Sequence, residues 1–348
     1  MRVLIVTTQV PFVRGGAEIL AEGLIKAICA KGHEAEIIAV PFKWYPPERI
    51  LDTMLACRLL DVSESCGQAI DRVIGLKFPA YLISHPNKVM WLLHQHRTAY
   101  DLWNTKYCDL IHFPNGLQIR EAIINADNQA FKEYQSIFTI AGNVSKRLKI
   151  FNQVDSIPLY NPPYKSESFY CEEPENYLFF PSRLSPMKRQ ELVIEAIAKT
   201  SNPVKVLFAG KPDENNYAKN LDNLAKKLKI SKRIVFLGEI GEEEKISTYA
   251  RSLAVIYPPF DEDYGYVTLE AMLASKPVIT CTDSGGSLEF VRHEETGLLA
   301  EPNSKSIAAA MDQLWENRYW AQTLGKAGRD YYDSLNISWS KVVQKLLS

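Results

Sequence analysis

The chain has 348 residues, which suits two domains of roughly 150–180 residues each better than one small core. Hydrophobic residues make up 46% and charged residues 23%, the balance of a globular protein that folds in water. The formal net charge is -1. This balance argues against a nucleic-acid binder whose affinity comes from neutralising phosphates.

The cysteines and the N-terminus indicate a cytoplasmic protein. The six cysteines are scattered without a C-x-x-C pair, so the sequence predicts neither a disulfide framework nor a zinc site with paired ligands. We expect reduced and mostly buried thiols. The N-terminus lacks the layout of a signal peptide, and no apolar run approaches the roughly 20 residues that span a bilayer.

Apolar strand-like runs alternate with amphipathic helical stretches in the first half of the chain. The helix predicted over 143–151 has Asn143 as its expected N-cap. The expected strands are 2–8, 34–40, 88–94 and 136–142, and the expected helices are 15–32, 47–60 and 143–151.

The alternation stops over residues 155–176 and then restarts. The richness of this segment in proline and polar residues indicates a linker. The expected strands of the second half are 177–183, 204–210, 233–240, 253–259 and 277–282. The expected helices are 188–199, 215–230, 242–252 and 267–275.

Strands separated by helices of this length predict parallel sheets with right-handed crossovers, and therefore an α/β fold with two doubly wound, Rossmann-like domains facing a cleft. We expect an N-terminal domain over 1–160, a linker over 161–176 and a C-terminal domain over 177–336. The last helix, 337–348, should pack back on the first domain. Ligands of such sheets bind at the carboxyl ends of the strands.

Gly15 and Gly16 stand where a loop becomes a helix N-terminus, a place that favours an anion. The other interpretation is a tight turn that needs a positive φ, and the segment alone favours neither. The chain has no G-x-G-x-x-G motif for binding a dinucleotide, which argues against a dehydrogenase.

Arg183 is expected to end a strand and Lys188 to open the next helix, which would let both side chains converge on one ligand. Two cations there suit a diphosphate, because arginine supplies paired donors and lysine a point charge. Arginine and lysine side chains usually lie in solvated loops. The neighbouring motif is what favours a ligand site here.

That neighbouring motif is "PPFDEDYGYVTLEAM", 258–272, where four carboxylates surround Gly265. We expect a helix to start near Tyr266 or Val267, with Glu270 in its first turn and Glu262 in the loop before it. An anion at this helix N-terminus would leave the carboxylates to accept hydroxyl hydrogens, as in a sugar nucleotide. Asp261 and Asp263 resemble a D-x-D metal clamp, but no further ligand stands at a suitable spacing. We therefore expect no metal.

His94 and His96 follow an apolar strand and begin a loop. Either histidine taken singly is more often ordinary surface, but the carboxyl end of a strand raises the prospect that one of them faces a ligand.

With these segments together, the chain resembles the glycosyltransferases of family 4, which have the GT-B fold. The resemblance runs nearly the whole length and is most specific over 260–304, with the E-x7-E pattern of Glu262 and Glu270 followed by "GGSLE" and "TGLLAEP". "PSRLSPMK" is similar to the arginine-plus-lysine motif of the family, and "RGGAE" is similar to its glycine loop.

The resemblance implies a retaining, metal-independent transfer of a hexose from a nucleotide diphosphate sugar, with no cofactor. It implies that Arg183 and Lys188 hold the diphosphate, that Glu262 steadies the donor sugar and that Glu270 binds the ribose. Gly15 and Gly16 are implied to contact the diphosphate, and the N–H groups of Gly265, Tyr266 and Val267 to contact phosphate and sugar. The base is implied to lie near Gly210, Gly238 and Ile240. The strand-end histidine of the family corresponds to His94, or to His96 after a shift of two.

The donor stays open between a UDP-sugar and GDP-mannose, because "EDYG" is only weakly similar to users of GDP-mannose. The expected acceptor is a glycan, a lipid-linked or a small-molecule acceptor in polysaccharide or glycoconjugate biosynthesis. The protein is not expected to bind nucleic acid. Peripheral contact with the inner face of the membrane stays an open possibility. Two alternatives remain: a GT-B sugar-nucleotide epimerase, and a non-catalytic nucleotide-sugar-binding protein.

Overall fold

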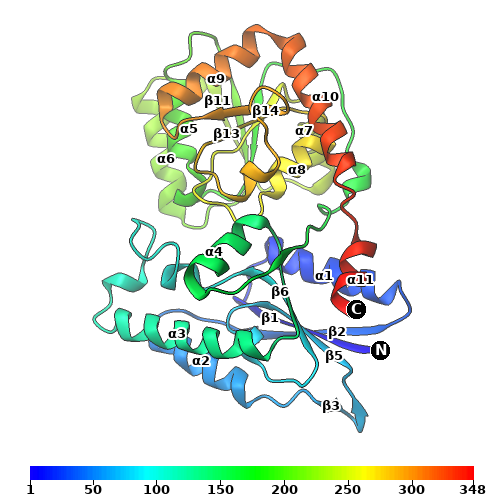
Figure 1. Cartoon of the computed structure of the whole chain (residues 1–348). Coiled ribbons are helices and arrows are strands. Elements are labelled where there is room, and N and C mark those ends of the chain that lie inside the picture. Colours follow the sequence, from blue (N-terminus) through cyan, green and yellow to red (C-terminus); the bar gives the residue numbers. More distant parts are fainter. The chain divides into compact units, whose positions relative to one another are not determined.

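The computed structural model describes residues 1–348, and the chain divides into two compact units (Figure 1). The N-terminal unit comprises Met1–Tyr164 together with Ser338–Ser348, and the C-terminal unit comprises Lys165–Ile337. Each unit is built on a six-stranded sheet flanked by helices, and neighbouring strands within each of these sheets pair in parallel. Both units are therefore doubly wound α/β domains.

The sheet of the N-terminal unit has the strand order β2-β1-β5-β6-β7-β8. The inner strands are continuous apolar runs because helices cover both faces of a parallel sheet. The strands are β1 Arg2–Gln9, β2 Glu34–Pro41, β5 Arg72–Lys77, β6 Lys88–His94, β7 Ser136–Thr139 and β8 Ile157–Pro158, with a separate hairpin of β3 Glu64–Ser65 and β4 Gln68–Ala69. The helices are α1 Gly16–Cys29, α2 Glu48–Leu59, α3 Gly116–Ala130 and α4 Gly142–Asn152.

The C-terminal helix α11, Trp339–Leu347, is part of the N-terminal unit and packs on α1. Its Trp339 ring lies so close to α1 that a Cβ added at Gly23 would approach it to 2.5 Å. Arg72 on β5 donates to the carbonyl oxygens of Leu346 and Ser348, at 2.9 and 2.8 Å. The helix α11 is thus fixed by ring packing at its start and by hydrogen bonds to backbone oxygens at its C-terminal end, where they lack partners inside the helix.

The sheet of the C-terminal unit has the order β11-β10-β9-β12-β13-β14. The chain winds from β9 to one side for two strands and then returns to the other side at β12, so a topological switch point lies between β9 and β12. The strands are β9 Leu178–Pro181, β10 Val206–Ala209, β11 Ile234–Gly238, β12 Ala254–Ile256, β13 Val278–Cys281 and β14 Gly297–Ala300. The helices are α5 Gln190–Ile197, α6 Asn215–Lys227, α7 Glu242–Arg251, α8 Tyr266–Leu273, α9 Ser304–Glu316 and α10 Arg318–Ser334.

The alternation of strands and helices expected from the sequence is confirmed, with two corrections. The N-cap of α4 is Ala141, so Asn143 is the second residue of the helix and its prediction as N-cap was wrong. Only Cys57, Cys108 and Cys281 are buried, whereas the other three cysteines are exposed, so the thiols are not mostly buried. The sequence analysis also did not identify β5, α3, β14, α9 and α10.

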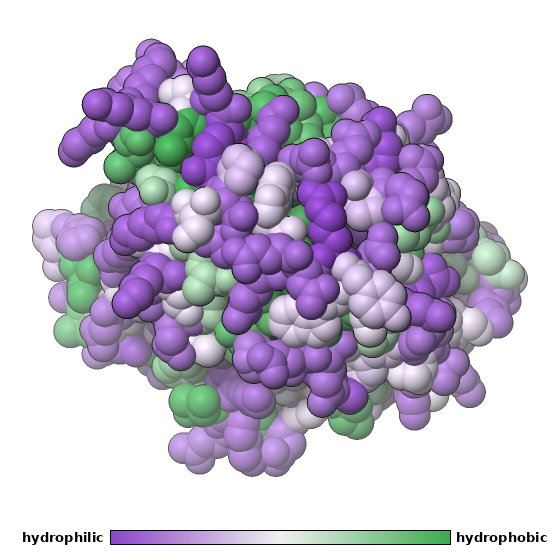
Figure 2. Space-filling model, turned by 90° about the horizontal axis from the view of Figure 1, so that it is seen from above, coloured by the Kyte–Doolittle hydropathy of each residue, from purple (hydrophilic) through white to green (hydrophobic).

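No helix of the structure combines the length and the apolar character that crossing a membrane requires. Hydrophilic residues cover most of the face shown in Figure 2, and apolar residues appear there only in small, scattered groups.

Candidate functional site

The loops that follow β9, β12 and β13 are tied together at the carboxyl edge of the C-terminal sheet. The Phe260 N–H donates to the Met187 carbonyl at 2.8 Å, and the Asp261 N–H donates to the Asp283 carbonyl at 2.9 Å. The guanidinium of Arg189 makes two parallel hydrogen bonds to the Asp283 carboxylate, at 2.7 and 2.6 Å. These contacts fix three segments, distant in sequence, at the switch point where doubly wound sheets bind ligands.

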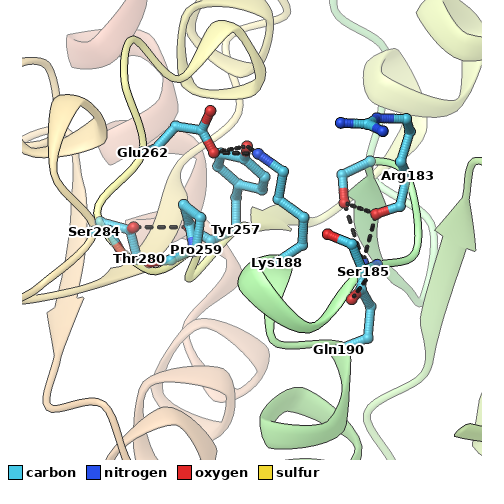
Figure 3. Close-up of polar contacts among 10 residues, drawn as sticks. Arg183, Ser185, Lys188, Gln190, Tyr257, Pro259, Glu262, Thr280 and Ser284 are labelled. Atoms are coloured by element: carbon cyan, nitrogen blue, oxygen red, sulfur yellow. Dashed lines mark hydrogen bonds and ion pairs between the residues drawn. The ribbon is translucent and has the colours of Figure 1, made fainter. Parts of the chain in front are cut away.

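Lys188 lies in a different local structure from the one expected. It ends a short 3-10 helix, Pro186–Lys188, and Arg189 with φ 60° separates it from α5. The prediction that Lys188 opens the helix was therefore wrong by two residues. Its Nζ donates to the Tyr257 hydroxyl at 2.9 Å and forms an ion pair with Glu262 (Figure 3). The structure thus joins a residue of the β9 loop with two residues of the β12 loop.

Glu262 lies in the loop before α8, as expected, and its side chain is 20% exposed. The Tyr257 hydroxyl donates to its carboxylate at 2.8 Å. Burial by itself would raise the pKa of Glu262, but the charge of Lys188 and the hydrogen bonds from Lys188 and Tyr257 outweigh burial and lower it. Glu262 is therefore an ionised carboxylate at neutral pH, able to accept hydroxyl hydrogens.

Arg183 follows the end of β9 by two residues and is exposed, and its guanidinium pairs with Asp213 at 2.6 Å. Arg183 and Lys188 are thus paired with different carboxylates, and their joint action on one ligand stays a prediction. The buried amide of Gln190 holds the intervening loop: it donates to the Arg183 carbonyl at 2.9 Å and accepts from the Ser185 N–H at 3.3 Å (Figure 3).

Gly265 begins α8 as its N-cap, with a φ of 79° that an L side chain rarely adopts. A Cβ at this position would lie 2.7 Å from the Ser287 Oγ. Gly286 is equally constrained, because its Cβ would lie 2.4 Å from the Asp263 carbonyl oxygen. The two glycines let the β12 and β13 loops approach at the α8 N-terminus, where Tyr266 is the first helical residue and Val267 the second.

Glu270 is the fifth residue of α8 and lies in its second turn. The prediction that it lies in the first turn was therefore wrong. The residue is buried at 8% exposure, and both carboxylate oxygens have partners on α7. Lys245 lies 2.9 Å from Oε1, and the Tyr249 hydroxyl donates to Oε2 at 2.7 Å. Burial by itself would lower the pKa of Lys245, but the charges of Glu270 and Glu242 outweigh burial and raise it.

Gly210 directly follows β10 and Gly238 ends the neighbouring strand β11, and both have a positive φ, of 144° and 70°. The Gly210 N–H donates to the Gly238 carbonyl at 2.7 Å, and a Cβ at Gly210 would lie 2.2 Å from the Ser182 carbonyl oxygen. Both glycines, with Phe208 among others, line a cavity of about 400 Å³ in this unit. Ile240 follows Gly238 by two residues and is half-buried.

In the N-terminal unit, Gly15 is the N-cap of α1, and its N–H donates to the Glu18 carboxylate at 2.7 Å. Neither Gly15 nor Gly16 has a positive φ. The tight turn that the sequence offered as the alternative interpretation is therefore not what these glycines form.

The two histidines have different surroundings. His94 ends β6, is half-buried, and its Nδ1 lies 2.7 Å from the Gln95 carbonyl. His96 packs against the rings of Phe42 and Phe78, with centroids at 6.1 and 5.2 Å. Burial, with a contribution from the charge of His94, lowers the pKa of His96 to about 4. His96 is therefore neutral at pH 7, and its place at a ligand, like that of His94, stays a prediction.

The sequence analysis did not identify Tyr257, Gln190, Tyr249 and Lys245, which are the partners of the predicted residues. Tyr257 gave a weak signal, since it is a hydroxyl-bearing residue directly after an apolar strand. The α7 residues gave none, because their spacing is that of an ordinary amphipathic helix. The structure places no group of three or more His, Cys, Asp or Glu residues where they could hold a metal ion, at Asp261 and Asp263 or elsewhere.

Two doubly wound domains of this kind make up the GT-B fold, and HepE from Anabaena, solved in complex with UDP-glucose, shares it. The TM-score is 0.73 at 17% identity, over 99% of this chain and 98% of that one. Residues 166–331 match the family model described as "Glycosyl transferases group 1", and this stretch lies within the C-terminal unit.

Two curated relatives agree with the family model. The uncharacterized glycosyltransferase MJ1607 of Methanocaldococcus jannaschii is 23% identical over 100% of this chain and 97% of its own length. The alpha-1,3/1,6-mannosyltransferase ALG2 of Mus musculus is 32% identical, over 34% of this chain and 28% of its own length. The chain thus spans less than a third of ALG2. Together these findings support a glycosyltransferase of the GT-B fold that takes its sugar from a nucleotide sugar.

Proposed function

We propose that this protein is a retaining, metal-independent and cofactor-free glycosyltransferase of family 4. It moves a hexose from a UDP-sugar or GDP-mannose to a glycan, a lipid-linked or a small-molecule acceptor in polysaccharide or glycoconjugate biosynthesis. The observation that carries the proposal is the cluster of Lys188, Glu262 and Tyr257 at the switch point of the C-terminal sheet, beside the N-terminus of α8.

The cluster suits the departure of a nucleoside diphosphate. Lys188 is 18% exposed and lies at the carboxyl edge of the sheet, where its charge can stabilise the developing negative charge of the leaving group. In the structure that charge is satisfied by Glu262 and Tyr257. A bound diphosphate would compete with Glu262 for the lysine, with Arg183 supplying further donors from the same loop.

The two glutamates suit the two ends of such a donor. Glu262 lies in the loop before α8 and Glu270 in its second turn, so they flank the helix N-terminus. N–H groups at that terminus favour phosphate oxygens. Ionised carboxylates accept hydroxyl hydrogens strongly, so Glu262 is assigned to the donor sugar and Glu270 to the ribose. The base is assigned to the ends of β10 and β11, near Gly210, Gly238 and Ile240.

The retaining step is assigned to attack by the acceptor on the same face that the diphosphate leaves. Lys188 and Tyr257 already hold the Glu262 carboxylate, so its role is to orient sugar hydroxyls and not to form a glycosyl bond. A glycosyl adduct trapped on Glu262 or Asp263 would contradict this mechanism. The donor contacts that the resemblance implies for Gly15, Gly16 and His94 stay predictions.

The names of the similar proteins support a hexose donor without selecting its base. ALG2 is named as a mannosyltransferase, and HepE was solved with UDP-glucose. The cytoplasmic location, at the inner face of the membrane when the acceptor is lipid-linked, belongs to the same proposal.

The first experiment measures thermal shift and turnover with a panel of UDP-, GDP- and ADP-sugars, each with Mg²⁺ and with EDTA. We expect one donor to stabilise the protein and to be consumed slowly, and EDTA to leave both effects unchanged. A donor epimerised without an acceptor would identify the epimerase. Tight binding without consumption across a broad acceptor panel would identify a binding protein.

A further inference from the structure

Tyr257 is a buried tyrosine that neither the sequence motifs nor the family resemblance assigns to the reaction. It is the first residue after β12, and it is 3% exposed. Its N–H donates to the Ile279 carbonyl at 2.9 Å, and its own carbonyl accepts from the Thr280 hydroxyl at 2.7 Å. The backbone of Tyr257 is therefore fixed on both sides to β13, at the edge where the site lies.

The ring of Tyr257 is held as firmly as its backbone. It packs edge-on against Phe180 of β9, with ring centroids at 6.1 Å. A tyrosine ring has two side-chain torsions, and this packing fixes where the hydroxyl points. The hydroxyl therefore reaches Glu262 and Lys188 from a backbone position that is hydrogen-bonded to β13.

The hydroxyl makes two directional hydrogen bonds. It donates its single proton to Glu262 at 2.8 Å and accepts from the Lys188 ammonium at 2.9 Å. A phenol can do both at once, because it has one donor and free lone pairs. Burial, with the nearby charge of Glu262, raises the pKa of Tyr257 well above its ordinary value, so the phenol keeps its proton.

We propose that Tyr257 is a positioning residue of the donor site, which holds the Glu262 carboxylate and the Lys188 ammonium in register through its hydroxyl. This inference rests on the proposed function, in which Glu262 orients the donor sugar and Lys188 stabilises the diphosphate. When Lys188 turns to the diphosphate, Glu262 loses its ion pair. The hydrogen bond from Tyr257 then still fixes the carboxylate against the sugar hydroxyls.

The test is Tyr257→Phe, which keeps the ring and removes the hydroxyl. Tyr177→Phe is the matched control, because Tyr177 is a buried tyrosine of the same unit whose hydroxyl donates to the Thr248 carbonyl at 2.9 Å and not to Glu262. We expect Tyr257→Phe to lower kcat about tenfold, with the donor KM changed less than twofold. Tyr177→Phe should leave both constants near wild type, while the two variants lose similar thermal stability.

A kcat within twofold of wild type in Tyr257→Phe would overturn the inference. A second readout does not depend on turnover: titration of the Glu262 carboxyl by ¹³C NMR in wild type, Tyr257→Phe and Tyr177→Phe. Loss of the hydroxyl hydrogen bond should raise the pKa of Glu262 in Tyr257→Phe only. If wild type binds and consumes no donor, the proposed function fails, and the titration alone decides on Tyr257. An unchanged Glu262 pKa in Tyr257→Phe would then show that the hydroxyl does not position the carboxylate.

Discussion

The hydroxyl of Tyr249 on α7 donates to the carboxylate of Glu270 on α8 at 2.7 Å. Lys245, one turn earlier on α7, pairs with the other carboxylate oxygen at 2.9 Å. A carboxylate that is 8% exposed would cost much free energy without such partners. Lys245 and Tyr249 therefore satisfy both oxygens of Glu270 and fix the direction of its carboxylate, which suits recognition of two neighbouring hydroxyls.

Glu270→Gln should weaken donor binding about 10- to 100-fold, because hydrogen bonds to a charged acceptor contribute about 1.5–3 kcal/mol. Isothermal titration with the donor selected from the panel measures this effect. The control is Glu175→Gln, which removes a carboxylate of the same unit that pairs with Arg251 at 3.3 Å and is about half exposed. Equal affinities for both variants would remove Glu270 from the donor site.

Lys188→Ala should reduce kcat roughly 100-fold, because it removes the charge that stabilises the leaving diphosphate. The loss of stability should be smaller than the loss of turnover, because Glu262 keeps the Tyr257 hydrogen bond after the lysine is removed. Lys226→Ala, at an exposed pair with Asp222 on α6, is the control and should change neither property. Turnover of Lys188→Ala at the wild-type rate would contradict the assigned role.

Gly265→Ala should lower the free energy of unfolding by about 2–3 kcal/mol, since a left-handed conformation costs an L residue roughly 1–2 kcal/mol and the new Cβ would crowd the Ser287 Oγ. Gly241→Ala is the matched control. Gly241 is also a helix N-cap, but its φ is -70° and no atom lies within 4 Å of its added Cβ. Denaturant unfolding should show a loss of only about 0.5 kcal/mol there. Similar losses at both glycines would contradict the strain argument.

Asp127 on α3 predicts a pH dependence of stability in the N-terminal unit. The carboxyl is fully buried, and the hydroxyls of Tyr81 and Tyr100 donate to it at 2.9 and 2.6 Å. Burial raises its pKa to about 7, against the lowering effect of the two hydrogen bonds. Between the unfolded pKa of about 4 and pH 7, the folded state therefore holds a proton that the unfolded state releases, so stability falls as the pH rises.

Asp127→Asn should remove this dependence, because an amide does not titrate and can still hydrogen-bond both tyrosines. The measurement is the denaturant midpoint of wild type and variant from pH 5 to pH 8. The wild type should lose stability relative to the variant as the pH rises through that range. Parallel curves, or a wild type that gains on the variant, would show that Asp127 is already ionised in the folded state at pH 5.

The sequence by itself determined the alternation of strands and helices and the positions of Glu262 and Gly265 before α8, because apolar periodicity and glycine placement are local properties of the chain. It did not reveal β5, whose short run is interrupted by Gly75, or the exact start of α5, which depends on the left-handed Arg189. The partners of the site residues were decided by tertiary structure alone. Tyr257 meets Lys188 across 69 positions, and Tyr249 meets Glu270 across 21, because parallel strands and their crossover helices bring separate loops to one sheet edge. Residue spacing along the chain does not predict such contacts, since they depend on the order in which strands pair in the sheet.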